Sequence, residues 1–503
     1  MPASTEQRMG SGAAWMVLFK LGERSLGIAS ILILVRLLSP HDFGFVAMAL
    51  SFIAMAELLT RAGFDVALIQ NQAATDRHYH TAWTCNVLIG LFIFLLMLVA
   101  AAPITAFYAE PTLFWVVCWL ALGPLISGCE NIGVVAFRKE LRFRSEFAYQ
   151  MSVKLAGFVV TVPLAFWLRS YWALVAGILA SKLMGTVISY FAHPFRPRFS
   201  IAGAGALFSF SKWLLLVNGL AFLKERLTDF VIGRSQGAAI LGVYNVAWDL
   251  AYLPTSELGA PINRALLPGF SQIAQNPAQL HSAYANAMGI LVLFALPAAA
   301  GIFAVSEYLV PVALGPKWLA AVPLMQILAF SGAILLFHSS MCTALIGAGH
   351  PAAVVKGNAV FVVLLVILLI PLAEWFGASG AGVAVLGASI LSTPVYLMAI
   401  RVHIGIAPAV FARAITRPLT ASVAMLAVLR AVMPAYSPSM TTSKAAWLLL
   451  GAVVLGAFLY ALAMALLWLA ARRPQSVERL VFERVRAMLV ARMAAWRRKT
   501  PDA

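Results

Sequence analysis

Fourteen separate apolar stretches constrain the fold of this chain more than any other feature of its sequence. Each is close to the roughly 20 residues that a helix needs to cross the hydrocarbon core of a bilayer. We place these spans at about 12–37, 43–60, 81–107, 112–135, 147–168, 171–191, 211–233, 241–264, 284–306, 319–346, 352–373, 378–400, 409–432 and 446–471. Because a backbone in lipid must satisfy its hydrogen bonds internally, such segments are expected to be helices. The sequence therefore predicts an all-α polytopic membrane protein with about 14 transmembrane helices.

The balance of apolar and charged residues excludes a soluble protein. Of the 503 residues, 62% are hydrophobic and 11% are charged, and the mean hydropathy is +0.90. The longest connections between spans are about 20 residues, too short for a folded catalytic domain. We find no nucleotide-binding loop or hydrolase motif, and the four cysteines lack metal-site spacing. We expect a transporter rather than an enzyme, with no cofactor and no bound metal, driven by an ion, potential or substrate gradient.

The net charge of +17 raises the question of a nucleic-acid ligand, but the distribution of the charge argues against one. With a cytoplasmic N-terminus, about 24 of the 36 Lys and Arg residues fall on cytoplasmic segments, 6 on the opposite side and 6 within spans. This asymmetry is the positive-inside bias that orients membrane proteins. We therefore expect no nucleic-acid partner and place both termini in the cytoplasm.

A weak internal repeat divides the chain. Val35-Arg36 followed by Asp42–Val46 has a counterpart in Gly233-Arg234 followed by Ile240–Tyr244, about 198 positions later. Pro163–Trp167 reappears as Pro371–Trp375, about 208 positions later. Each repeat holds six spans, an even number, so both repeats begin on the same side of the membrane. The sequence therefore predicts two parallel six-helix lobes, related by an axis along the membrane normal, that rock against each other.

The repeat sets the predicted domain boundaries. We place an N-lobe at 1–192, a cytoplasmic linker at 193–210, a C-lobe at 211–401, two extra spans at 402–471 and a basic tail at 472–503. Apolar residues of the tail recur at helical spacing. We expect an amphipathic helix that lies on the anionic inner leaflet, with a solvated basic tail as the alternative.

Ionisable residues inside spans are costly, and by default they face the interior of the bundle. The first span and the span at 211–233 hold corresponding places in the two repeats, and both carry mixed charge. They are expected to bring this charge to the lobe interface at mid-depth. The predicted substrate-binding cations are Lys20, Arg24, Lys154, Lys182, Lys224 and Arg226. Basic groups in a partly buried cavity suit an anionic ligand such as a pyrophosphate headgroup.

Acidic groups within the spans at 12–37, 211–233 and 241–264 are candidates for a coupling proton or Na+. They are Glu23, Glu225, Asp229 and Asp249. Burial would raise their pKa values and bring protonation into range. The alternative for these charges is structural, because Lys20 with Glu23, or Lys224 with Asp229, would form ion pairs that hold helices together.

Two segments of the chain carry a recognisable pattern. The first runs from Val35 to Gly44 and continues through Gly63-Phe64 and Ala67–Gln70. The second runs from Leu241 to Asn245 and continues through Leu253-Pro254 and Leu267–Ser271. Together they resemble the polysaccharide transport family, the Wzx-like branch of the multidrug/oligosaccharidyl-lipid/polysaccharide (MOP) exporter superfamily. The resemblance extends through the fourteenth span, and it implies a MOP/MATE-like fold of two six-helix lobes with two extra helices.

The resemblance also implies a function. Members of this family are flippases that move undecaprenyl-pyrophosphate-linked oligosaccharide repeat units across the bacterial inner membrane, for O-antigen, capsule or exopolysaccharide. It implies membrane lipids as surroundings, and a polysaccharide polymerase and a chain-length regulator as further partners. An ion-coupled multidrug or metabolite exporter of the same superfamily is the alternative, and a membrane-bound glycan polymerase or ligase is a more distant one.

Overall fold

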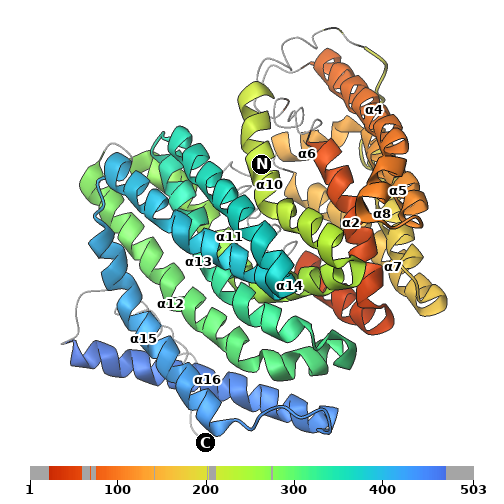
Figure 1. The fold of residues 1–503 in the computed structure, drawn as a ribbon. Coiled ribbons are helices and arrows are strands. Elements are labelled where there is room, and N and C mark those ends of the chain that lie inside the picture. Colours follow the sequence, from red (N-terminus) through yellow and green to blue (C-terminus); the bar gives the residue numbers. More distant parts are fainter. Residues whose placement is uncertain are drawn as a thin grey trace, which may run out of the picture. The chain divides into compact units, whose positions relative to one another are not determined.

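The computed structural model describes residues 22–58, 68, 75–140, 142–200, 202, 211–273 and 276–471. These residues form helices joined by short connections, and no strand occurs among them (Figure 1). The chain divides into two compact units. The first comprises Met1–Asn245, Ala313–Trp318 and Leu369–Ala381, and the second comprises Val246–Val312, Leu319–Leu368 and Gly382–Ala503. The lobe boundaries drawn from the sequence stay a prediction, and the predicted tail lies outside the described residues.

The first unit is built from hairpins of long apolar helices. After a helical segment at 22–37, its elements are α2 (Pro40–Glu57), α4 (Asp76–Tyr108), α5 (Leu113–Gly128), η1 (Ile132–Val134), α6 (Val135–Lys139), α7 (Phe143–Leu168), α8 (Trp172–Ala192), α10 (Ser211–Gln236) and the start of α11 (Ala238–Ile273). The pairs α4 with α5 and α7 with α8 pack closely, and α2 packs against α5 and α10. A cluster of buried residues joins the segment at 22–37 to α7 and the start of α8.

Local chemistry fixes where α2 begins. The Ser39 hydroxyl accepts a hydrogen bond from the Asp42 amide, and the Asp42 carboxylate accepts one from the Ser39 amide at 2.9 Å. This capping box satisfies two amides that a helix start would leave without partners. Pro40 at the first helical position needs no such partner. The other carboxylate oxygen of Asp42 accepts a hydrogen bond from the Tyr171 amide at 2.9 Å, which ties α2 to the start of α8.

A bent pair of helices anchors the chain that follows α8. The axis turns by 63° between α5 and the η1–α6 helix, and Asn131 is fully buried at the turn. The Asn131 side chain donates to the carbonyls of His193 and Phe195, at 3.3 and 2.7 Å. Further on, the Ser200 amide donates to the Thr84 hydroxyl at 2.9 Å. We call residues 193–200 the strap, because these bonds hold it to Asn131 and to Thr84 of α4, within the first unit.

The second unit is a bundle around α12. Its elements are most of α11, α12 (Pro277–Leu309), the start of η2 (Val310–Leu314), α13 (Ala321–Gly347), the outer parts of the two arms of α14 (Pro351–Ile404), α15 (Pro408–Val432) and α16 (Thr442–Ala470). The end of η2, all of η3 (Pro316–Trp318) and the middle of α14 belong to the first unit. Helix α12 packs against α13, α15 and α16 (Figure 1). A buried cluster of small and branched side chains fills the space among α12, α15 and α16.

Helix α14 is two helices that meet at Gly377. Its 54 residues would extend about 80 Å if straight, well over twice the hydrocarbon thickness of a bilayer. Gly377 has φ 61° and ψ −142°, a conformation that only glycine adopts readily, and it breaks the helix. The predicted spans at 352–373 and 378–400 lie on either side of this break.

Length, hydropathy and surface identify the chain as a multi-pass membrane protein. Eight described helices are long and apolar enough to cross a bilayer, or nine if the bent α5–α6 pair counts as one span. Large apolar side chains also face outward, among them Trp167 at 81% and Phe191 at 87% exposure. Such exposure is unfavourable in water and ordinary in lipid. The prediction of an all-α polytopic membrane fold is confirmed, whereas the count of 14 helices stays a prediction.

Candidate functional site

One buried carboxylate organises the polar residues of the first unit. Asp229 of α10 is 3% exposed. Its Oδ2 lies 3.0 Å from a guanidinium nitrogen of Arg226 and accepts a 3.2 Å hydrogen bond from the Ser51 hydroxyl of α2. The Asn245 side chain of α11 also hydrogen-bonds to this carboxylate. The carboxylate thus has the charged and polar partners that a buried anion requires, and the four side chains connect three helices.

This arrangement orients Arg226. The guanidinium has five N–H donors in a fixed fork, and Asp229 engages only one of its nitrogens in the described structure. The Arg226 side chain is 40% exposed, whereas its partner is buried. A cation held on one side and open on the other is suited to bind an anion such as a phosphate group. Among the predicted substrate-binding cations, Arg226 is paired with a buried carboxylate while its own side chain stays partly exposed.

The other predicted site residues are spread over several elements. Lys20 lies outside the described residues. Lys154 of α7 lies 3.4 Å from the Glu23 carboxylate, and its side chain is half exposed. A pair this accessible contributes about 0–1 kcal/mol. Lys182 of α8 is exposed, while Lys224 of α10 is half-buried.

Arg24 and the remaining carboxylates complete the set. Arg24, on the helical segment at 22–37, has its Nε buried. Glu225 of α10 and Asp249 of α11 are both exposed, and Asp249 belongs to the second unit. Among the described residues, two of the predicted cations form ion pairs with predicted carboxylates, Lys154 with Glu23 and Arg226 with Asp229. The expected pairs of Lys20 with Glu23 and of Lys224 with Asp229 stay predictions.

The first unit also contains a contact between repeat-related glycines. A Cβ added to Gly44 of α2 would collide with the Ala238 carbonyl, and one added to Gly242 of α11 would collide with the Pro40 carbonyl. Small residues allow helix backbones to approach this closely in membranes. The glycines of the two repeat copies thus mark where the beginnings of α2 and α11 cross.

A second set of contacts near this crossing consists of hydrogen bonds to the C-terminal end of the helical segment at 22–37. The Lys317 ammonium donates to the Arg36 carbonyl at 3.0 Å and also to the Leu38 carbonyl. The Trp318 indole donates to the Val35 carbonyl at 3.0 Å. Helix C-termini leave carbonyls without partners and favour a nearby cation. We call Lys317, Trp318 and these three carbonyls the carbonyl clamp.

Burial lowers the pKa of Lys317, an effect that the nearby Asp42 carboxylate opposes.

A contact between α10 and α14 lies at the break of α14. The Gln236 side chain donates to the Ala373 carbonyl at 3.2 Å, four residues before Gly377. In an unbroken helix this carbonyl would accept from residue 377, so Gln236 supplies a donor where the helical pattern is interrupted.

Only some residues of these contacts can be recognised from the sequence. Asp229 and Arg226 were identified as ionisable residues within a span. Ser51 and Asn245 carry no such signal, because Ser and Asn are common in membrane helices. Lys317 lies between the predicted spans at 284–306 and 319–346, and nothing local in the sequence indicates that carbonyls about 280 positions away accept its hydrogen bonds. No described group of three His, Cys, Asp or Glu side chains is placed to hold a metal ion.

Known proteins resemble this chain in sequence and in fold. The family model described as "Polysaccharide biosynthesis protein" matches residues 33–323. The lipopolysaccharide biosynthesis protein WzxC of Escherichia coli K12 is 27% identical over 333 residues, which cover 65% of this chain and 68% of WzxC. The succinoglycan biosynthesis transport protein ExoT of Rhizobium meliloti is 26% identical over 356 residues, which cover 70% of this chain and 72% of ExoT.

The fold is shared with a solved flippase. The lipid II flippase MurJ, in an inward closed conformation, superposes with a TM-score of 0.75 over 91% of this chain and 100% of MurJ, at 13% identity. At this identity the likeness concerns the fold alone. The family match covers more than half of the chain, and the two curated relatives bear names from surface-polysaccharide pathways. The chain belongs to the polysaccharide biosynthesis protein family, the Wzx-like branch with the fold of the MOP exporters.

Proposed function

We propose that this protein flips undecaprenyl-pyrophosphate-linked oligosaccharide repeat units from the inner to the outer leaflet of the bacterial inner membrane. The observation that carries the proposal is the combination of a polysaccharide-biosynthesis family with a fold shared by a lipid II flippase. The name of ExoT adds transport to biosynthesis. The flipped units would pass to a polymerase and a chain-length regulator outside the membrane, and both termini of the chain would face the cytoplasm.

Arg226 is the residue we assign to the pyrophosphate. Its guanidinium is oriented by the buried Asp229 and remains 40% exposed, so it can form charge-assisted hydrogen bonds with a phosphate. Arg24 and Lys224 are the proposed secondary cations, together with Lys20, Lys154 and Lys182. The polyprenyl chain would stay in lipid while the headgroup and glycan cross. Moving this apolar chain from lipid into a polar site would be unfavourable in free energy.

Alternating access would rely on the crossing of α2 and α11 and on the carbonyl clamp. With a cytoplasmic N-terminus, both lie at the outward ends of the helices. While the crossing and the clamp are closed, they would separate the bound headgroup from the outside of the membrane. Opening them would require the two predicted lobes, 1–192 and 211–401, to separate at this end. Among the coupling candidates, Glu23 and Asp229 have cationic partners, whereas Glu225 and Asp249 are exposed, and the coupling ion stays a prediction.

A deletion strain tests the function. We expect undecaprenyl-pyrophosphate repeat units to accumulate on the cytoplasmic side, as measured by mass spectrometry of extracted lipids, with loss of surface polymer. Wild-type protein should restore both. Arg226→Gln should lower polymer by about tenfold or more at equal protein level, since it removes a charge-assisted hydrogen bond. Lys444→Gln, at an exposed lysine of α16, is the matched control. Normal polymer without accumulated intermediate, in a strain with no second flippase, would favour the exporter alternative.

A further inference from the structure

A groove in the second unit lies between the two arms of α14. Its cavity volume is about 390 Å³, within the range of small-molecule sites in proteins. The first arm contributes Lys356 near its beginning, and the second arm contributes Val395, Met398, Val402 and His403. His350 and His403 stack with ring centroids 4.3 Å apart, which confirms that the outer ends of the two arms meet.

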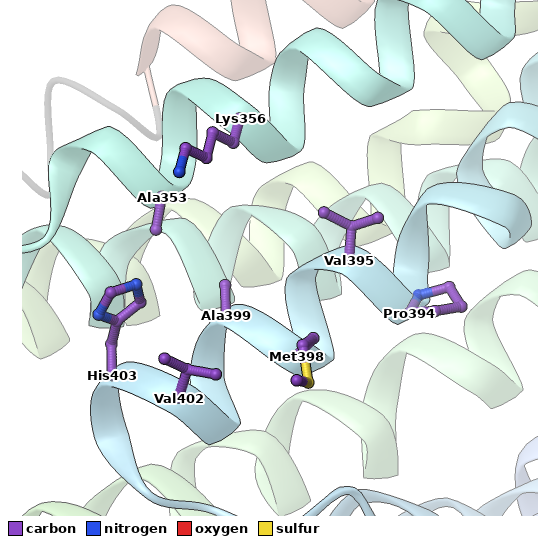
Figure 2. Close-up of a pocket in the computed structure, with 8 residues that line it drawn as sticks. All are labelled: Ala353, Lys356, Pro394, Val395, Met398, Ala399, Val402 and His403. Carbon is purple, nitrogen blue, oxygen red and sulfur yellow. The ribbon is translucent and has the colours of Figure 1, made fainter.

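The groove has a polar end and an apolar end. Figure 2 shows the Lys356 ammonium and the His403 ring toward one end, and Pro394 and Val395 toward the other. Nine residues separate Pro394 from His403, so the apolar end lies about 13 Å deeper along the helix. Met398 and Val402 are 55% and 62% exposed, so the apolar wall is open at its side. This is the shape of a site for an amphiphile with a polar head and an apolar chain.

Outside α14, the described carboxylates of the second unit are Asp249 and Glu257 of α11 and Glu307 of α12, and none of them forms an ion pair with Lys356 at the polar end of the groove. Lys356 makes no ion pair within the described chain, and Arg401 lies two residues before His403. Glu374 is the only carboxylate in α14, and it lies 18 residues from Lys356, about 27 Å along the helix. Helices α13, α15 and α16 contain no Asp or Glu at all. An anion that neutralises this end must therefore come from outside these helices.

The position along the helix suits a lipid headgroup. Lys356 is the sixth residue of α14, about 7.5 Å from its start, and His403 is the second from its end. Both groups lie where a span would meet the boundary between acyl chains and headgroups. Basic pockets between transmembrane helices at this depth bind anionic lipids.

We propose that this groove is a binding site for an anionic phospholipid of the surrounding bilayer. The headgroup phosphate accepts hydrogen bonds from the Lys356 ammonium, beside His403. One acyl chain lies along Val402, Met398 and Val395 toward Pro394. The site is separate from the residues assigned to the flipped substrate, and it does not depend on the flippase proposal. A lipid bound in the groove contacts both arms of α14 and stabilises their packing at the end opposite the break at Gly377.

Native mass spectrometry of the delipidated full-length protein tests the site. The protein is titrated with phosphatidylglycerol and, separately, with phosphatidylcholine of the same acyl chains. We expect tighter binding of phosphatidylglycerol, and a loss of about fivefold in its affinity for Lys356→Gln, the contribution of one basic residue near an anionic lipid. Lys356→Arg should keep the affinity. Lys444→Gln removes an equal charge from another helix end and should have no effect.

A second variant tests the apolar end. Val395→Trp fills the groove and should weaken the binding of both lipids, with the protein still monodisperse on size exclusion. If that variant does not fold, the Lys356 series decides alone. The proposal is overturned if wild type binds both lipids equally, if Lys356→Gln binds phosphatidylglycerol as wild type does, or if Lys444→Gln loses as much. It is also overturned if undecaprenyl phosphate displaces phosphatidylglycerol from the groove at lower concentration, because the groove would then serve the flipped substrate.

Discussion

At the scale of single residues, the pair of Arg226 and Asp229 links stability to function. Asp229 is buried while the Arg226 side chain is 40% exposed, so the two charges contribute differently to stability. Removing the guanidinium leaves a buried carboxylate without its charged partner, which is costlier than losing an exposed cation. Removing both charges avoids that cost. The stability of the pair can therefore be separated from its proposed role in binding.

We predict that Arg226→Leu destabilises the protein by about 2–3 kcal/mol, below the usual range for a fully buried pair because the guanidinium is partly exposed. The double variant Arg226→Leu/Asp229→Leu should recover most of this loss. Unfolding midpoints in detergent, by fluorescence thermal shift, measure both. Lys182→Leu, at an exposed and unpaired position of α8, should change the midpoint little. Equal loss in the single and double variants would contradict the role of the buried carboxylate.

His193 gives the strap a dependence on pH. Burial lowers the pKa of His193, and the Arg142 and Arg196 guanidiniums add to the effect while Glu140 opposes it. The His193 Nδ1 accepts a hydrogen bond from the Phe195 amide at 3.2 Å, which requires a neutral ring nitrogen there. Since the folded-state pKa is below the unfolded value, the stabilisation is complete above pH 6.5 and is lost as pH falls from there toward the lowered pKa.

We therefore predict that hydrogen exchange of the strap, corrected for intrinsic rates, accelerates between pH 7.5 and 5.5. His193→Asn keeps a side-chain acceptor that does not titrate, and should flatten this dependence. His281→Asn, in the second unit, is the control that should leave exchange of the strap unchanged. A wild-type strap whose protection is the same at both pH values would contradict the prediction.

At the scale of elements, the predicted spans agree with the apolar part of the described long helices and, at α7 and α15, with their C-terminal ends, but they miss several helix starts. Helix α2 begins at Pro40 rather than at 43, because Ser39 and Asp42 cap it. Helix α4 begins at Asp76 rather than at 81, since polar first-turn residues continue a helix beyond the apolar stretch. Hydropathy reports where lipid surrounds the chain, whereas caps determine where a helix begins and ends. The partners of Asp229 and Lys317 could not be predicted, because they depend on tertiary packing.

The crossing of α2 and α11 rests on two glycines. Gly242→Ala places a methyl group against the Pro40 carbonyl, so the helices must separate. We expect a destabilisation of about 1–3 kcal/mol, typical of overpacking, measured as a lower unfolding midpoint. Gly451→Ala on α16 meets no atom within 4 Å and should be neutral or slightly stabilising. Equal midpoints for the two variants would show that the close approach does not matter.

At the scale of the whole molecule, the first unit is made of segments that the repeat assigns to both predicted lobes. Residues 313–318 and 369–381 belong to it, although they lie within the second repeat. Through the carbonyl clamp and Gln236, these segments hold the ends of the segment at 22–37 and of α10. The clamp joins the predicted N-lobe to the predicted C-lobe, so its hydrogen bonds must break if the lobes are to open at this end, whereas Gln236 and Ala373 both lie in the C-lobe. The clamp is therefore the place where a lock should stop a rocking transporter.

A reversible cross-link across the clamp tests this expectation. Arg36 Nε donates to the Ala313 carbonyl at 3.3 Å, so these two positions adjoin. In a background with the four native cysteines replaced, Arg36→Cys/Ala313→Cys is bridged with a short bifunctional maleimide that contains a disulfide. We expect transfer of lipid-linked oligosaccharide in proteoliposomes to stop, and to return after reduction, because the outward end can no longer open. Each single cysteine variant, treated in the same way, should transport normally. Undiminished transport with the bridge intact would show that flipping does not require the clamp to open, and would leave the rocking mechanism without support at this end of the molecule.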